Sequence, residues 1–350
     1  MIEINKEQTS LDLIRGLAAL LVLLGHTRSD MFAPFTDLSN KNIYSFLFYG
    51  ITRLGHEAVI VFFILSGFLV GGGIIRDIKM NKFNIYTYAI KRATRIFVPL
   101  IPACIFTAFI HRYISSEWPE ITVVMSNMFG LNGIITKTLK YNGALWSISY
   151  EIWFYIAGGL FALSIITKNH NITIILFIII SYVFYNLKPV YLAMWIAGAL
   201  TMAYGDMWKN KIYAIIGIFV MITLIALDKL GFIQREISEI IISISFCMIL
   251  PYATSNTINK HLNKIRYFSI WLSSFSYTLY LFHYPISKLL SRNNNIFYVL
   301  DERSIYIYIE NITINIIICY ILYFAFERNT YFLRSYVFKY FYKEQKRVRS

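Results

Sequence analysis

The segment LDLIRGLAALLVLLGH, residues 11–26, decides the class of fold. It is almost entirely aliphatic, and similar apolar runs recur along the chain at about the 20 residues that a helix needs to cross a bilayer. Of the 350 residues, 57% are hydrophobic and only 15% are charged, whereas soluble domains carry roughly 25% charged residues. The runs are continuous and lack the two-residue alternation of membrane β-barrels. The sequence therefore predicts an all-α, polytopic membrane protein.

Ten apolar segments are predicted as membrane spans, at residues 11–29, 56–75, 94–112, 144–166, 172–187, 190–205, 212–228, 237–254, 269–290 and 305–326. Residues 118–135 are less apolar and are predicted as a loop that contains an interfacial or re-entrant helix. An even number of spans puts both termini on one side. The loops on that side carry most of the Lys and Arg residues, which favours cytoplasmic termini.

This layout predicts one membrane domain over residues 1–335, followed by a basic cytoplasmic tail over residues 336–350 that contacts anionic lipid headgroups. The net charge of +14 follows from the same cytoplasmic bias, so we expect membrane lipids and no nucleic acid as partners of the basic residues. Each cysteine lies inside an apolar run, and no metal-binding spacing such as CxxC occurs. We expect no metal site, and we expect buried thiols at Cys104, Cys247 and Cys319.

Ionisable residues inside a span are costly and usually face the bundle interior or a cavity. In the first span, Arg15 and His26 are 11 residues apart, which places them on one helix face, roughly 16 Å apart along the axis. Asp12 lies one turn before Arg15 and can pair with it. These residues either form a functional stripe, or they mark the membrane interface while His26 reaches outward to water.

The fourth span contains Glu151, with Ser147 one turn earlier on the same face. A carboxylate at this depth needs a partner or a proton. Glu151 could orient an imidazole and stabilise its protonated form, as carboxylates do in acyl-transfer sites. A structural hydrogen bond to a neighbouring helix is an equally good interpretation.

Arg92 and Arg95 are spaced to share a helix face at the cytoplasmic start of the third span, where both could bind a phosphate. An ordinary positive-inside cluster is the simpler interpretation for either residue. In the second span, Gly67 and Gly71 form a GxxxG pattern that allows close helix packing, or a slot that admits a narrow ligand chain. His283, two residues before Pro285 in the ninth span, is interpreted as a satisfied polar group.

Five of these stretches, taken in order, resemble the motifs of the acyltransferase-3 family, which modifies polysaccharides and other cell-surface or secreted molecules. They are DLIRGLAALLVLLGH, HEAVIVFFILSGFL, RATRIFVP, LWSISYE and SYTLYLFHYPI, and they span residues 12–286. Many members carry a C-terminal SGNH-type esterase domain that handles the acceptor. Since such a domain is missing from this sequence, we expect the membrane part or a separate partner to complete transfer.

The resemblance implies an acyl-CoA donor, with acetyl-CoA the commonest, that binds as a substrate and not as a tightly held cofactor. It also implies a hydroxyl acceptor on a glycan or lipid-linked glycan, such as O-antigen or exopolysaccharide, and a place in the inner (plasma) membrane of a bacterium. Within this resemblance, His26 matches the catalytic histidine, Arg15 the first-helix arginine needed for activity, and Glu151 the acidic residue of the fourth motif. The residues expected to hold the donor are Arg92, Arg95, Arg15, Gly67 and Ser66.

These implications lead to one mechanistic hypothesis, in which His26 acts as the general base on a sugar hydroxyl. A covalent acyl-imidazole at His26 is a second route. A transporter or flippase for a lipid-linked glycan could use the same intramembrane charges and is the alternative function. A purely structural membrane subunit would instead tolerate substitution at Arg15, His26 and Glu151.

Overall fold

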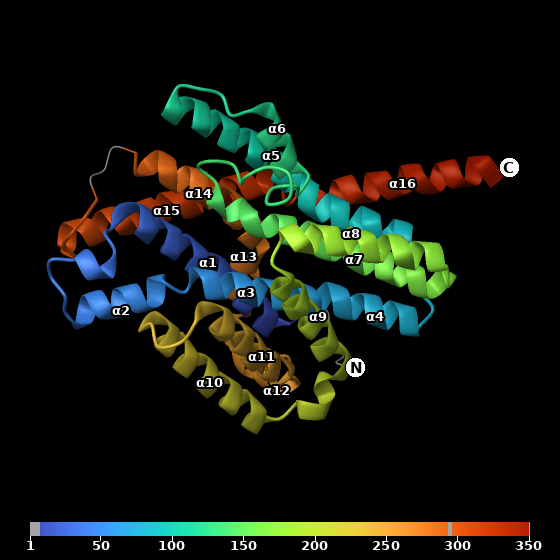
Figure 1. Ribbon diagram of the computed structural model, residues 1–350, viewed down its shortest axis with the longest axis horizontal. Helices are drawn as coiled ribbons and strands as arrows, with labels where there is room; N and C mark the ends of the chain where they lie inside the picture. The colour runs from blue at the N-terminus through green and yellow to red at the C-terminus, as the bar shows by residue number, and fades with distance from the viewer. Residues whose placement is uncertain (1–7, 293–295, 350) are drawn as a thin grey trace. The chain divides into compact units, whose positions relative to one another are not determined.

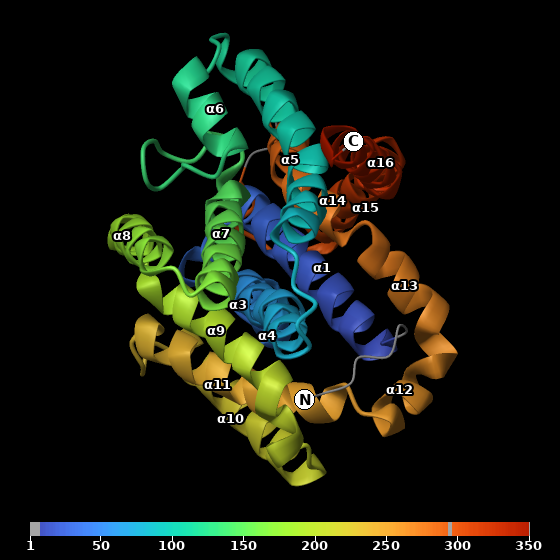
Figure 2. The same cartoon turned by 90° about the vertical axis from the view of Figure 1, so that its right-hand side faces the viewer.

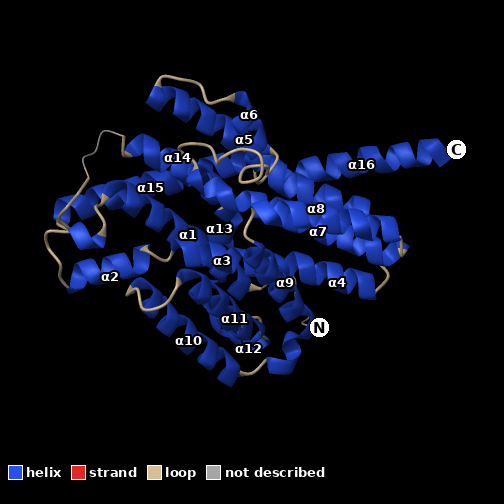
Figure 3. Ribbon diagram, viewed as in Figure 1, coloured by secondary structure: helices blue, strands red, loops and turns tan. Residues whose placement is uncertain are grey.

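The computed structural model describes residues 8–292 and 296–349, and these are predominantly helical (Figure 3). Within these ranges there is no strand beyond the isolated bridges Phe32–Phe297 and Asn132–Thr136. Seven helical segments of the described chain are long and apolar enough to cross a membrane: Thr9–Met31, Ile43–Lys79, Ile85–Ser115, Gly143–Thr167, Lys211–Lys229, Arg235–Ala253 and Glu302–Tyr340. The predicted all-α membrane protein is confirmed. The number of ten spans and the cytoplasmic termini stay predictions.

The chain, whose helices are labelled in Figure 1, divides into two compact units, of which the first comprises Met1–Gly25, Asn42–Lys82 and Ile156–Ser276. This unit contains the first part of α1 (Thr9–Met31) and the part of α7 (Trp146–Thr167) from Ile156 onward. Its other helices are α2 (Ile43–Thr52), α3 (Gly55–Ser66), α4 (Gly72–Lys79), α8 (His170–Asn186), α9 (Pro189–Tyr204), α10 (Lys211–Lys229), α11 (Arg235–Ala253), α12 (Asn256–Leu262) and α13 (Arg266–Ser274). A π-helical stretch, Gly67–Gly71, joins α3 to α4.

Glycines bring the backbones of α3 and α9 into contact within this unit, where the two helices pack side by side. A Cβ atom built on Gly67 would lie only 1.9 Å from the carbonyl oxygen of Trp195, and one on Gly198 would lie 2.2 Å from that of Ile64. Small residues at such crossings let membrane helices approach closely. Close packing therefore accounts for Gly67, and its predicted contact with a donor stays untested.

Gly67→Ala should lower the stability of the protein by about 1–3 kcal/mol, because the added methyl group forces the backbones of α3 and α9 apart. The matched control is Gly73→Ala in α4, where a Cβ atom would meet nothing within 4 Å and where alanine is the better helix former. Thermal unfolding in detergent measures both variants. Equal melting temperatures for the two would contradict the packing role of Gly67.

The second unit comprises His26–Lys41, Phe83–Tyr155 and Tyr277–Ser350. Its helices are α5 (Ile85–Ser115), α6 (Ile121–Met128), the first part of α7 (Trp146–Thr167), α14 (Ser276–Leu290), α15 (Glu302–Ala325) and α16 (Thr330–Arg349). Both α6 and α16 pack against α5 (Figure 2). The predicted helix within residues 118–135 is present as α6, whereas its position relative to the membrane stays a prediction.

The predicted ninth span, residues 269–290, is wrong as one continuous helix. It is divided at Phe275 into α13 and α14. Hydroxyl groups explain the break, because Ser273, Ser274 and Ser276 each donate to the carbonyl three residues earlier. Serine side chains that bond to the backbone in this way compete with regular helix.

Two further features bear on the sequence predictions. Helix α2 occupies residues predicted as loop, and it begins with a capping box in which Asn42 and Ser45 exchange side-chain hydrogen bonds. The predicted tail, residues 336–350, forms the end of α16 up to Arg349. Residue 350 and residues 1–7 lie outside the described chain. The three cysteines are buried and free, as predicted.

Candidate functional site

Two histidines from distant parts of the sequence meet in the second unit. His26 Nδ1 lies 3.1 Å from His283 Nε2, which joins the last turns of α1 to α14. His283 is completely buried, whereas His26 is only partly buried. The ring of Tyr284 meets the ring of His26 edge-on, with 4.7 Å between their centroids. The first span therefore delivers an imidazole that a second imidazole and a tyrosine hold in place.

Two further hydrogen bonds join the same pair of helices beyond this contact. Thr27 and Ser287 share a hydrogen bond of 3.2 Å, and Lys288 donates to Asp30 Oδ1 over 2.6 Å. These partners follow His26 and His283 by one to five residues, which is within about one and a half helical turns. These two hydrogen bonds contribute to the packing of α1 against α14.

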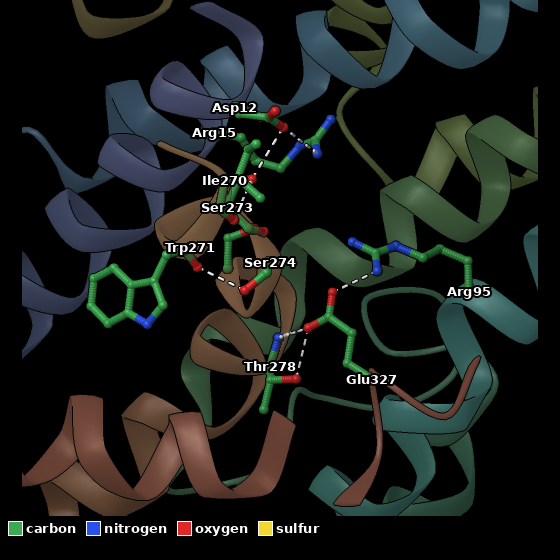
Figure 4. A network of polar contacts seen from close by, with 10 residues as sticks. Asp12, Arg15, Arg95, Ile270, Trp271, Ser273, Ser274, Thr278 and Glu327 are labelled. Carbon is green, nitrogen blue, oxygen red and sulfur yellow. Dashed lines mark hydrogen bonds and ion pairs between the residues drawn. The ribbon is translucent and has the colours of Figure 1, made fainter. Parts of the chain in front are cut away.

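Arg95 is held by an ion pair in the second unit. Its Nη1 lies 2.5 Å from Glu327 Oε1, and its guanidinium also lies over the ring of Tyr277. The other oxygen of Glu327 accepts from the backbone and the hydroxyl of Thr278, at 2.9 and 2.7 Å (Figure 4). Only 2% of the Glu327 side chain is exposed, against 35% for Arg95. Glu327 thus ties the start of α14 to α5.

Arg92 differs from Arg95, although the two share one face of α5. Its guanidinium lies 5.5 Å from the ring centre of Tyr155, and it makes no ion pair with any residue of the described chain. Its Nε is buried without a hydrogen-bond partner there. Of the two predicted phosphate-binding residues, Arg92 therefore keeps more of its charge available for an anionic ligand.

Glu151 accepts a hydrogen bond from the hydroxyl of Tyr155, one turn further along α7, over 2.6 Å. The imidazole that touches His26 is His283, so His283 occupies the position that the sequence suggested for a carboxylate. The predicted catalytic role of Glu151 stays a prediction.

The remaining predicted residues belong to the first unit. Arg15 pairs with Asp12 at 3.8 Å, which confirms the predicted contact, and Ser273 donates to the same carboxylate (Figure 4). Ser66 accepts a hydrogen bond from the indole of Trp195, next to the glycine contact of α3 with α9. Helix α1 is continuous from Thr9 to Met31, as the predicted spacing of Arg15 and His26 requires.

The profile of an acyltransferase domain, that of the acyltransferase-3 family, matches residues 8–326. The chain belongs to this family. Membership of the acyltransferase-3 family agrees with the all-helical fold and its apolar helices long enough to cross a membrane.

A curated relative, the O-acetyl transferase of Shigella phage Sf6, is 28% identical over 183 residues. The alignment covers 49% of this chain and 50% of the relative, so the match spans about half the length of each protein. No solved structure matches the chain.

The interpretation of His283 as a satisfied polar group is confirmed, but sequence reasoning about this acyltransferase-3 member missed its contact with His26 and missed Glu327. His283 carried a usable signal, because an ionisable side chain inside an apolar span is rarely placed there without a partner. Glu327 carried no such signal in the sequence. It directly follows the last predicted span, where an acidic residue at the interface is unremarkable.

Proposed function

We propose that the protein transfers an acetyl group from acetyl-CoA to a hydroxyl of a cell-surface glycan, in the inner membrane of a bacterium. The observation that carries this proposal is the partly buried His26 held against the buried His283. The name of the phage relative supports acetyl as the group that is transferred, and Arg92 supplies a cation for the phosphates of the donor.

In the proposed reaction, His26 removes the proton from the sugar hydroxyl as its oxygen attacks the thioester carbonyl. The carbon–sulfur bond then breaks, and the leaving thiolate takes the proton from the imidazolium. The products are an acetyl ester and free CoA. A positioned general base of this kind contributes about 10²–10⁴-fold in rate.

The test uses membrane vesicles of the host strain, in which the acceptor is present, and acetyl-CoA labelled in the acetyl group. We expect base-labile label in the glycan fraction and one free thiol for each label that is transferred. Vesicles from a strain that lacks the gene should show neither. Unchanged labelling in those vesicles would overturn the proposal, and transport of an unmodified glycan without thiol release would indicate a flippase.

A further inference from the structure

The buried hydrogen bonds of His283 determine which nitrogen of its own ring carries the proton. Its Nδ1 lies 2.9 Å from the carbonyl oxygen of Leu279, one turn earlier in α14. A carbonyl oxygen only accepts hydrogen bonds, so Nδ1 must be the protonated nitrogen. No carboxylate is among the hydrogen-bond partners of this side chain in the described chain. A fully buried imidazole without such a partner is neutral, because burial disfavours the charged form. Nε2 of His283 is therefore an acceptor.

The same reasoning extends to His26. Since His283 Nε2 accepts, the hydrogen bond of 3.1 Å between the rings requires His26 Nδ1 to be the donor. In the neutral ring of His26 the lone pair is then on Nε2. Among the described residues, Nε2 of His26 has no hydrogen-bond partner and is not an enclosed, unsatisfied atom.

We propose that His283 is the positioning residue of the transfer site, which fixes His26 as the Nδ1–H tautomer and leaves Nε2 as the atom that takes the substrate proton. When Nε2 has taken that proton, the imidazolium still donates from Nδ1 to His283. A hydrogen bond from a charged donor is stronger than one from a neutral donor, so the pair stabilises the protonated base. This inference rests on the proposed function, and it adds the residue that orients the base.

Other charged and titratable groups around His26 could also affect how the rate of transfer depends on pH. They come from the same two helices and are Arg28, Asp30, Tyr284 and Lys288. Lys288 forms an ion pair with Asp30, and the ring of Tyr284 meets the imidazole of His26 edge-on. None of these residues accepts a hydrogen bond from His26 Nδ1, so His283 is the group whose removal changes the tautomer.

The experiment compares His283→Leu, His283→Gln and Ser287→Ala with the unsubstituted enzyme in the labelled-vesicle assay. Leucine removes the acceptor, whereas the side-chain carbonyl of glutamine can replace it. Ser287→Ala is the matched control, because Ser287 links the same two helices through Thr27 and its side chain makes no hydrogen bond to either imidazole in the described chain. Protein amount and melting temperature in detergent are recorded for each variant.

We expect His283→Leu to lower kcat about 10–100-fold, by analogy with the cost of removing a group that orients a metal-bound imidazole, with KM for acetyl-CoA within about twofold. The acid limb of its pH–rate profile should move to lower pH by roughly half a unit, because the protonated base has lost a hydrogen bond. Glutamine should restore a large part of kcat, and Ser287→Ala should retain it.

Three results would overturn the assignment of His283: equal losses in the leucine and glutamine variants, an unchanged acid limb in His283→Leu, or an equal loss in Ser287→Ala. Failure of the proposed function is distinguishable from these results, because the unsubstituted enzyme would then transfer no label at all.

Discussion

Acetyl transfer should fall by at least about 10²-fold when His26 is replaced by alanine, because the reaction loses the base that takes the hydroxyl proton. His26→Gln should fall as far, since an amide cannot take up that proton near neutral pH. The ring of His26 is only partly buried, so both proteins should still insert into the membrane. The measured quantity is the amount of labelled acetyl group transferred per amount of inserted protein, with acetyl-CoA at a saturating concentration.

Thr27→Ala is the control for His26. Thr27 is the next residue in α1, is fully buried and bonds to Ser287 on the same partner helix. This variant should lose some stability and retain most of its turnover. If His26→Ala kept more than about a tenth of the activity, the base would have to be another group. Accumulation of acetylated enzyme that disappears in His26→Ala would favour the acyl-imidazole route over direct transfer.

The second prediction is that the two arginines of α5, Arg92 and Arg95, have different functions. Arg92→Ala should raise KM for acetyl-CoA about tenfold or more, which is the effect of losing one hydrogen bond to a charged group. Its melting temperature should change little, because Arg92 makes no ion pair in the described chain. Arg92→Lys should recover part of the affinity, since lysine keeps the charge but loses the planar guanidinium.

Arg95→Ala should instead lower the stability of the protein, because it leaves the buried carboxylate of Glu327 with Thr278 as its remaining partner. The free energy of unfolding should fall by somewhat less than the roughly 1.5–3 kcal/mol that a hydrogen bond between charged groups contributes. The effect is smaller because 35% of the Arg95 side chain is exposed to solvent. Glu327→Ala should be similarly unstable. The double variant should lose less than the sum of the single losses, which is the sign of a direct pair.

Additive losses would show that Arg95 and Glu327 act independently. An increase in KM for acetyl-CoA that is larger in Arg95→Ala than in Arg92→Ala would reverse the roles given to the two arginines. Kinetics with varied acetyl-CoA and thermal unfolding in detergent, measured on the same preparations, decide between these outcomes.

Much of the helical content could be predicted from the sequence, because long apolar runs have few other stable conformations in a bilayer. The run that became α1 and the run that became α10 agree with the predicted ranges to within a few residues. The break at Phe275 could not be predicted from hydropathy, since it depends on serine hydroxyls that find backbone acceptors. Hydropathy averages over a window and carries no information about such local bonds.

The same distinction between predictable and unpredictable features applies to the candidate site. The 11-residue spacing in α1 and the pairing of Asp12 with Arg15 are local, so helix geometry alone predicts them. The contact of His26 with His283 joins residues 257 positions apart, and that of Arg95 with Glu327 joins residues 232 apart. Neither follows from spacing, because it depends on which helices become neighbours. This also explains why Arg92 and Arg95 look equivalent in the sequence and differ in the structure.

The hydrogen bond from His283 to the Leu279 carbonyl has a consequence for the resting enzyme. An aspartate at position 283 could also orient the base, but it would place a permanent negative charge in an apolar interior, where an isolated ion is expensive. A neutral imidazole anchored to a carbonyl avoids that charge while the enzyme is idle. In the proposed mechanism, the pair becomes charged only during each turnover, for as long as the transferred proton stays on His26. The electrostatic cost of acid–base chemistry inside the membrane is therefore transient.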